Sequence, residues 1–222
     1  MSRLLALPDT RLGEEIASSV LHGLGALLSI AGVAVLATLA ALRGGASHVV
    51  GCSVFGGTLV LLYAASTLYH SLPQPRAKAV FRLLDHAAIF LLIAGTYTPF
   101  TLVSLRGPWG WSLLAAIWSM AVVGVLLRVV LRPRSTAWFV VLYVVMGWLV
   151  IVAAAPLSRA LPAGGLALLV AGGVAYTAGI AFYGWKRLPY HHAIWHGFVL
   201  AGSVLHFLAV LWYVIPSPAL AG

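Results

Sequence analysis

Three histidines are spaced so that they could hold a metal ion. His192 and His196 stand four positions apart, and His70 ends the segment that begins at Ser66. Residues four apart share one face of a helix. Two imidazoles on one helical face, with a third from another segment, form the three-nitrogen set that binds catalytic zinc and leaves one coordination position open. The spacing predicts a zinc site, but interfacial histidines near helix ends show the same spacing, so the prediction depends on the surrounding elements.

The composition indicates a chain that is solvated by lipid. Of its 222 residues, 62% are hydrophobic and 8% are charged, whereas soluble domains carry roughly 25% charged residues. The formal net charge is +9, but the basic residues stand singly between apolar runs, which argues against a nucleic-acid partner. Cys52 is the single cysteine, which excludes an internal disulfide and a multi-cysteine metal site. No soluble protein partner is evident.

Apolar stretches of spanning length fill nearly the whole chain. A bilayer core about 30 Å thick is crossed by roughly 20 helical residues, and short breaks rich in glycine, proline and arginine separate such stretches here. The sequence predicts an all-α, polytopic membrane protein in which residues 1–222 form one domain, a bundle of seven transmembrane helices. We expect these helices near residues 17–42, 49–70, 83–104, 109–131, 136–156, 163–185 and 191–214.

The distribution of basic residues predicts the orientation, because lysines and arginines near helix ends are retained in the cytoplasm. Three of them, Arg43, Arg106 and Arg159, fall on one side of the expected bundle, and ten fall on the other. The bias places the N-terminus in the cytoplasm and the C-terminus outside. The ten are Arg3, Arg11, Arg76, Lys78, Arg82, Arg128, Arg132, Arg134, Lys186 and Arg187.

With this topology, ionisable groups from four helices fall into one layer near the cytoplasmic ends. Each such group costs about 2.5–3.5 kcal/mol inside a spanning segment, so their convergence strengthens the zinc prediction. The layer contains Glu15, His22, His70, Asp85, His86, His192 and His196. We expect Glu15, His22 and His86 to act as polar braces or to hold the ligands in place. His206 lies about 15 Å deeper along the last helix, where an internal hydrogen bond is expected.

Four segments resemble the bacterial hemolysin III proteins. They are Glu14 to Gly23, Ser66 to His70 together with Leu84-Asp85-His86, Gly95 to Phe100, and His192 to His196. That family is related to the progestin and adipoQ receptors and the alkaline ceramidases, a superfamily of membrane hydrolases. The resemblance implies zinc bound by His70, His192 and His196, with Asp85 as the acidic residue beside the reacting water and Ser66 as a further catalytic candidate. It also implies the bacterial inner membrane as the location.

Three functions follow as alternatives. The first is a zinc-dependent hydrolase of an amide or ester bond in a membrane lipid, in which Asp85 accepts a proton and Ser66 stabilises the oxyanion or orients Asp85. The second is a non-enzymatic regulator or sensor of lipid state with a structural zinc ion, which a site closed by Asp85 would favour. The third is a hemolysin-like pore, which needs a polar path across the bilayer. We rank the pore last, because the ionisable groups occupy a single layer.

Overall fold

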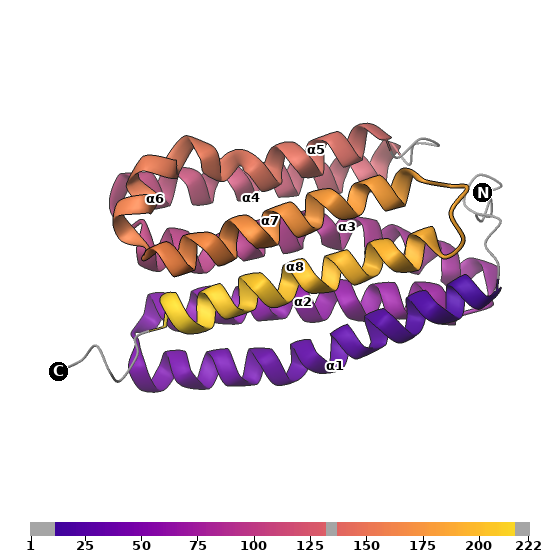
Figure 1. Ribbon diagram of the computed structural model, residues 1–222, viewed down its shortest axis with the longest axis horizontal. Helices are drawn as coiled ribbons and strands as arrows, with labels where there is room; N and C mark the ends of the chain where they lie inside the picture. Colours follow the sequence, from indigo (N-terminus) through magenta and orange to yellow (C-terminus); the bar gives the residue numbers. More distant parts are fainter. Residues whose placement is uncertain (1–11, 132–136, 216–222) are drawn as a thin grey trace.

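The protein is a bundle of long helices with nearly parallel axes (Figure 1). The computed structural model describes residues 12–131 and 137–215, and within these ranges seven helical spans are long and apolar enough to cross a membrane. The elements are α1 (Leu12–Arg43), α2 (Ala46–Ser71), α3 (Pro75–Pro99), η2 (Phe100–Ser104), α4 (Gly107–Leu131), α5 (Ala137–Trp148), η3 (Leu149–Ala153), α6 (Ala154–Ala160), α7 (Ala163–Gly184) and α8 (His191–Tyr213). The expected all-α membrane bundle is thereby confirmed.

The exterior of the bundle is apolar and part of its interior is polar. Leu27, Val123 and Ile151 are more than half exposed, whereas Ser18, His22 and His196 are almost completely buried, as are other polar residues. Lipid solvates apolar side chains, so large hydrophobic groups are stable on the surface of a membrane bundle. Ionisable groups are stable only where they face other parts of the protein.

Two expected helices begin earlier along the chain than predicted. α3 starts at Pro75 rather than near residue 83, with proline in the first turn, where its missing N–H costs no hydrogen bond. Residues 75–82 carry Arg76, Lys78 and Arg82, so hydropathy does not reveal this polar beginning. α1 starts at Leu12 rather than near residue 17.

Two spans change helix type part-way. The third continues past Pro99 as the π-helical turn η2, because proline removes a backbone donor. The fifth passes through the 3-10 segment η3 and continues as α6 to Ala160, four residues beyond the predicted end at 156. The Tyr97 hydroxyl donates to the carbonyl oxygens of Met146 and Gly147, and the backbone N–H of Val150 donates to it. Tyr97 therefore satisfies backbone groups that the change of helix type releases.

Figure 1 shows the beginnings of α1 and α8 and the end of α2 at one end of the bundle. The largest interfaces join α1 to α2, α2 to α3 and α7 to α8, while α5 and α7 share only a small one. The cytoplasmic location of this end stays a prediction from the basic residues. Of those residues, Arg3, Arg11, Arg132 and Arg134 lie outside the described ranges.

Candidate metal centre

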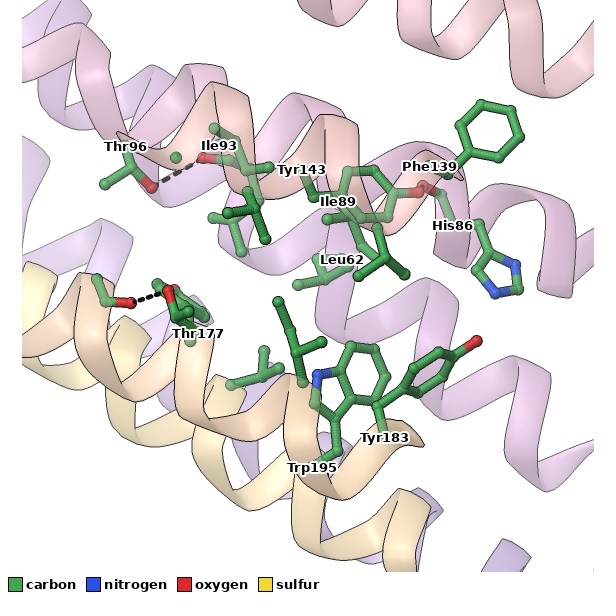
Figure 2. A pocket seen from close by; sticks show the side chains of 18 of the residues that line it. Leu62, His86, Ile89, Ile93, Thr96, Phe139, Tyr143, Thr177, Tyr183 and Trp195 are labelled. Carbon is green, nitrogen blue, oxygen red and sulfur yellow. Dashed lines mark hydrogen bonds between the residues drawn. The ribbon is translucent and has the colours of Figure 1, made fainter. Parts of the chain in front are cut away.

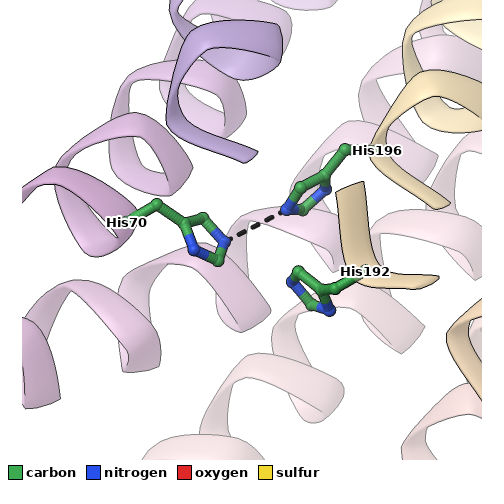
Figure 3. A group of neighbouring side chains, drawn as sticks. All are labelled: His70, His192 and His196. Atoms are coloured by element: carbon green, nitrogen blue, oxygen red, sulfur yellow. Dashed lines mark hydrogen bonds between the residues drawn. The ribbon is translucent and has the colours of Figure 1, made fainter. Parts of the chain in front are cut away.

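Two helix ends bring the three predicted ligands together. His70 lies in the last turn of α2, while His192 and His196 occupy the first two turns of α8, and Figure 3 shows the three rings facing one another. One ligand nitrogen from each ring can be chosen so that all lie within 4.8 Å of one another. The Nε2 atoms of His70 and His196 are 3.1 Å apart. Two nitrogens bound at 2.0–2.1 Å to one tetrahedral zinc ion would be roughly 3.3 Å apart, so the spacing suits a shared ion.

The buried nitrogens of α8 also fit a metal ion. His196 is completely buried and His192 is partly exposed, yet His192 Nε2 and His196 Nδ1 are buried atoms without a hydrogen-bond partner in the described part of the chain. Leaving a buried polar atom without a partner costs about 1–3 kcal/mol. A metal ion at the point where the rings converge would remove this cost for His192 Nε2.

Glu15 fixes the orientation of the His70 ring. Its Oε2 atom lies 3.0 Å from His70 Nδ1 and accepts a 2.6 Å hydrogen bond from Lys78 Nζ. When Nδ1 carries the proton and donates to the carboxylate, Nε2 keeps its lone pair and is the nitrogen free to bind metal. Lys78, from the first turn of α3, pairs with the same carboxylate.

Glu14 links α1 to the beginning of α8. Its Oε1 atom accepts a 2.9 Å hydrogen bond from the backbone N–H of His192, one of the first-turn donors that have no partner within the helix. Tyr190, which precedes α8, adopts a left-handed backbone conformation with φ of 59°. The chain therefore reverses sharply before α8, and Glu14 positions the turn that carries His192.

Asp85 and Ser66 lie beside the histidines but do not belong to the group of candidate ligands. Asp85 is 4% exposed and Ser66 is completely buried, and the Asp85 carboxylate interacts electrostatically with His70 and Arg128. Ser66 lies close to Asp85, although its hydroxyl makes no hydrogen bond of good geometry within the described residues. The carboxylate and the hydroxyl are thus available to groups bound at the site.

His22 and His86 of the predicted layer make separate sets of contacts. The His22 ring packs on His196, with 3.6 Å between ring centroids, and also contacts Tyr63. His86 Nδ1 lies 2.7 Å from the Arg82 carbonyl oxygen and 3.0 Å from Arg128 Nη2. A single nitrogen cannot donate to the first and accept from the second at once, so only one of these two contacts is a hydrogen bond in a given tautomer. Neither histidine belongs to the three-nitrogen group.

A large cavity opens beside the metal centre. About 1200 Å³ of space free of protein atoms lies along it, part of which is open to the surroundings, and its walls come mainly from α3, α5, α7 and α8. In Figure 2, His86 and Tyr183 lie at one end of the cavity and Thr96 and Thr177 at the other. His22, Asp85 and Arg128 also line it, whereas most of the other lining residues are apolar. None of the three candidate ligands lines the cavity, but Asp85 and His22, which contact or interact with them, do.

His206 lies outside the metal centre, as expected from its depth. Its Nε2 atom donates a 3.0 Å hydrogen bond to the carbonyl oxygen of Leu169 on α7. The expected internal hydrogen bond is confirmed, and His206 provides a buried histidine of the same helix with which the three candidate ligands can be compared.

Known relatives are similar to this chain over most of its length. The profile of the family described as Haemolysin-III related matches residues 10–207. The Hemolysin-3 protein of Bacillus cereus is 48% identical over 204 residues, which are 92% of this chain and 93% of the relative. The Hemolysin-3 homolog of Bacillus subtilis (strain 168) is 44% identical over 208 residues, 94% of this chain and 98% of the relative. The chain belongs to the hemolysin III family.

A weaker likeness extends beyond the bacterial hemolysin III proteins. The human monocyte to macrophage differentiation factor is 26% identical over 171 residues, which are 74% of this chain and 71% of that protein. This match supports the relation to the progestin and adipoQ receptors. No solved structure matches the chain. Family membership and the seven apolar spans identify this hemolysin III chain as an integral membrane protein, and the bacterial inner membrane is consistent with both.

Sequence reasoning missed three contributors to the site of this hemolysin III protein. Lys78 and Arg128 were interpreted only as topology signals, although Lys78 binds Glu15 and Arg128 is buried beside Asp85. Glu14 was not singled out, because adjacent acids at a helix start also occur as solvated residues. Arg128 did carry a detectable signal, since it interrupts an apolar run several residues before the end of its helix.

Replacing Glu15 with glutamine is expected to weaken zinc binding by this hemolysin III protein roughly 10- to 100-fold. Glutamine keeps the length of the side chain but removes the charge that fixes the proton on His70 Nδ1 and that pairs with Lys78. Competition with a chromophoric chelator would measure the affinity of the purified protein. Ser19→Ala is the matched control, because Ser19 bonds Ser71 at the same end of the bundle. Equal affinity in wild type and Glu15→Gln would contradict this role of Glu15.

Proposed function

We propose that this protein is a zinc-dependent hydrolase that releases a fatty acid from an amide or ester bond of an acylated membrane lipid. The observation that carries the proposal is the position of the buried Asp85, which interacts with His70 of the three-histidine group and also lines a large, mostly apolar cavity. A hydrolase for a lipid needs a polar reacting centre that is continuous with space for an acyl chain.

His70, His192 and His196 would hold the zinc ion. Zinc bound by three imidazoles supplies Lewis-acid chemistry, which activates water near neutral pH and polarises a carbonyl. Asp85 accepts a proton from the water that attacks the acyl carbon, and it can then pass the proton to the amine or alcohol that leaves. Its burial excludes bulk water, which would otherwise compete for the same proton.

Ser66 and Arg128 have roles that suit the charges of the reaction. The Ser66 hydroxyl donates a hydrogen bond to the oxygen that becomes negative on the acyl carbon, or orients Asp85 for proton transfer. Arg128 is 7% exposed and its Nε atom has no hydrogen-bond partner in the described ranges. A buried guanidinium in a membrane protein favours an anionic ligand. A carboxylate product with an apolar tail matches both Arg128 and the cavity beside it.

The regulator with a structural zinc ion is the second candidate. It would gain support if Asp85 completed a four-ligand site, because structural zinc sites are closed. The described group of mutually close ligand atoms contains the three histidines and not Asp85, which favours the hydrolase.

The function can be tested by incubating purified, zinc-loaded protein with a panel of acylated membrane lipids. We expect slow release of a fatty acid, detected by mass spectrometry, with sphingolipid-like amides as the first class to examine. Protein that binds zinc but leaves every lipid of a broad panel intact would favour the regulator.

A further inference from the structure

A second cavity adjoins the large cavity beside the three histidines. The second cavity contains about 560 Å³ of free space and reaches Leu113 and Leu157. Both cavities share six lining residues, which we call the waist: Thr96, Tyr97, Gly147, Trp148, Gly173 and His206. The waist residues therefore lie between the two cavities.

Hydrogen bonds hold the aromatic rings of the waist in place. The Tyr97 hydroxyl bonds the backbone around the break between α5 and η3, and Trp148 Nε1 donates a 3.0 Å hydrogen bond to Thr177 Oγ1 on α7. The His206 ring is fixed by the carbonyl oxygen of Leu169. Rings that are held by such bonds cannot easily swing aside for a ligand, so the width of the waist depends on the residues between them.

Gly147, which is exposed, and Gly173, which is partly buried, both have room for a side chain. A Cβ atom at Gly147 would meet no atom within 4 Å, and at Gly173 it would meet only the Trp148 ring, at 3.7 Å. Gly172 and Gly202 differ, because a Cβ atom there would clash with His206 and Tyr176, respectively. Glycine lowers helix stability when no close contact requires it. Glycine at positions 147 and 173 is consistent with an open path between the two cavities.

We propose that the waist selects ligands by acyl-chain length, with chains beyond a certain length having to pass between Gly147 and Gly173 into the second cavity. The inference rests on the proposed function in taking a fatty acyl chain as the ligand. Asp85 and Tyr97 both line the large cavity, and the part of α3 between them is about 18 Å long at 1.5 Å per residue. With its polar end anchored near Asp85 and Arg128, a chain that exceeds this length when extended must cross the waist, whereas a short chain need not.

Binding of octanoic and stearic acids to zinc-loaded protein tests the proposal without requiring turnover. Equilibrium dialysis of each radiolabelled acid would give its dissociation constant for wild type and for Gly173→Leu. We expect the variant to bind stearic acid at least about tenfold more weakly, because the buried methylenes beyond the waist lose their site. Octanoic acid should bind with an affinity within about twofold of wild type.

Gly57→Leu is the matched control, because Gly57 is exposed on α2, does not line either cavity, and would accept a Cβ atom without contacts. Gly173→Ala is a milder variant that raises helix propensity and should give a smaller loss of stearic acid only. Equal weakening of both acids, unchanged binding of both, or no binding of either acid to wild type would overturn the proposal.

The outcomes also separate this inference from the proposed function. Suppose that Gly173→Leu weakens the binding of stearic acid but not of octanoic acid, while wild type hydrolyses no lipid. This result would support selection of chain length at the waist and contradict the hydrolase function. Hydrolysis by wild type, together with unchanged binding of both acids to the variant, would contradict the waist alone.

Discussion

Alanine at His70, His192 or His196 is expected to reduce bound zinc from about one ion per chain to a small fraction of that value. Each substitution leaves two nitrogens of a site that needs three protein ligands. The loss should be similar for ligands from α2 and α8, because the three rings converge on one point. Inductively coupled plasma mass spectrometry on monodisperse fractions would measure the zinc content.

His206→Ala is the control for this experiment. It removes a buried histidine from the helix that carries His192 and His196, but its ring bonds a backbone carbonyl oxygen of α7. We expect its zinc content to match that of wild type. Equal loss of zinc from His206→Ala and from the three ligand variants would show that the site is misplaced.

Replacing Asp85 with asparagine is expected to reduce lipid hydrolysis on the order of 100-fold or more while most of the zinc remains. Asparagine keeps the size of the side chain but does not accept a proton at neutral pH. The Asp85 side chain lies outside the group of mutually close ligand atoms, so its substitution should leave that group intact. Fatty-acid release and zinc content would be measured on the same preparation.

A parallel fall of zinc and activity in Asp85→Asn would give this residue a different role. It would mean that Asp85 helps to hold the metal, as the structural-zinc alternative requires. Unchanged activity with full zinc would remove Asp85 from the reaction altogether.

The helical spans were predictable because lipid imposes a simple requirement on length and polarity. An uninterrupted apolar run of spanning length must satisfy its backbone hydrogen bonds internally, and a helix does so. The beginning of α3 was not predictable in this way, because Arg76, Lys78 and Arg82 make its first turns polar. The 3-10 segment η3 is flanked by Gly147 and Pro156, and the Tyr97 hydroxyl of another helix accepts a hydrogen bond from its Val150 N–H. This tertiary contact is not visible in the local sequence.

The three-histidine group was predictable in part for two reasons. Two of its histidines have helical spacing, and burying ionisable groups in a membrane span costs free energy. His192 and His196 share a helical face, and an ionisable group in a membrane span needs a reason to be retained. The contacts that orient the ligands depend on tertiary packing. Lys78 resembles an ordinary topology signal until α3 brings it to Glu15, and the cavity walls resemble an ordinary apolar core in sequence.

Fatty-acid release by a single purified preparation, measured before chelation, after chelation and after zinc is restored, tests the central claim most directly. We predict that the protein releases fatty acid from at least one acylated membrane lipid, that removal of zinc abolishes the release, and that stoichiometric zinc restores it. Release that persists undiminished after zinc has been removed, or a fully zinc-loaded protein that releases none from a broad lipid panel, would contradict the account.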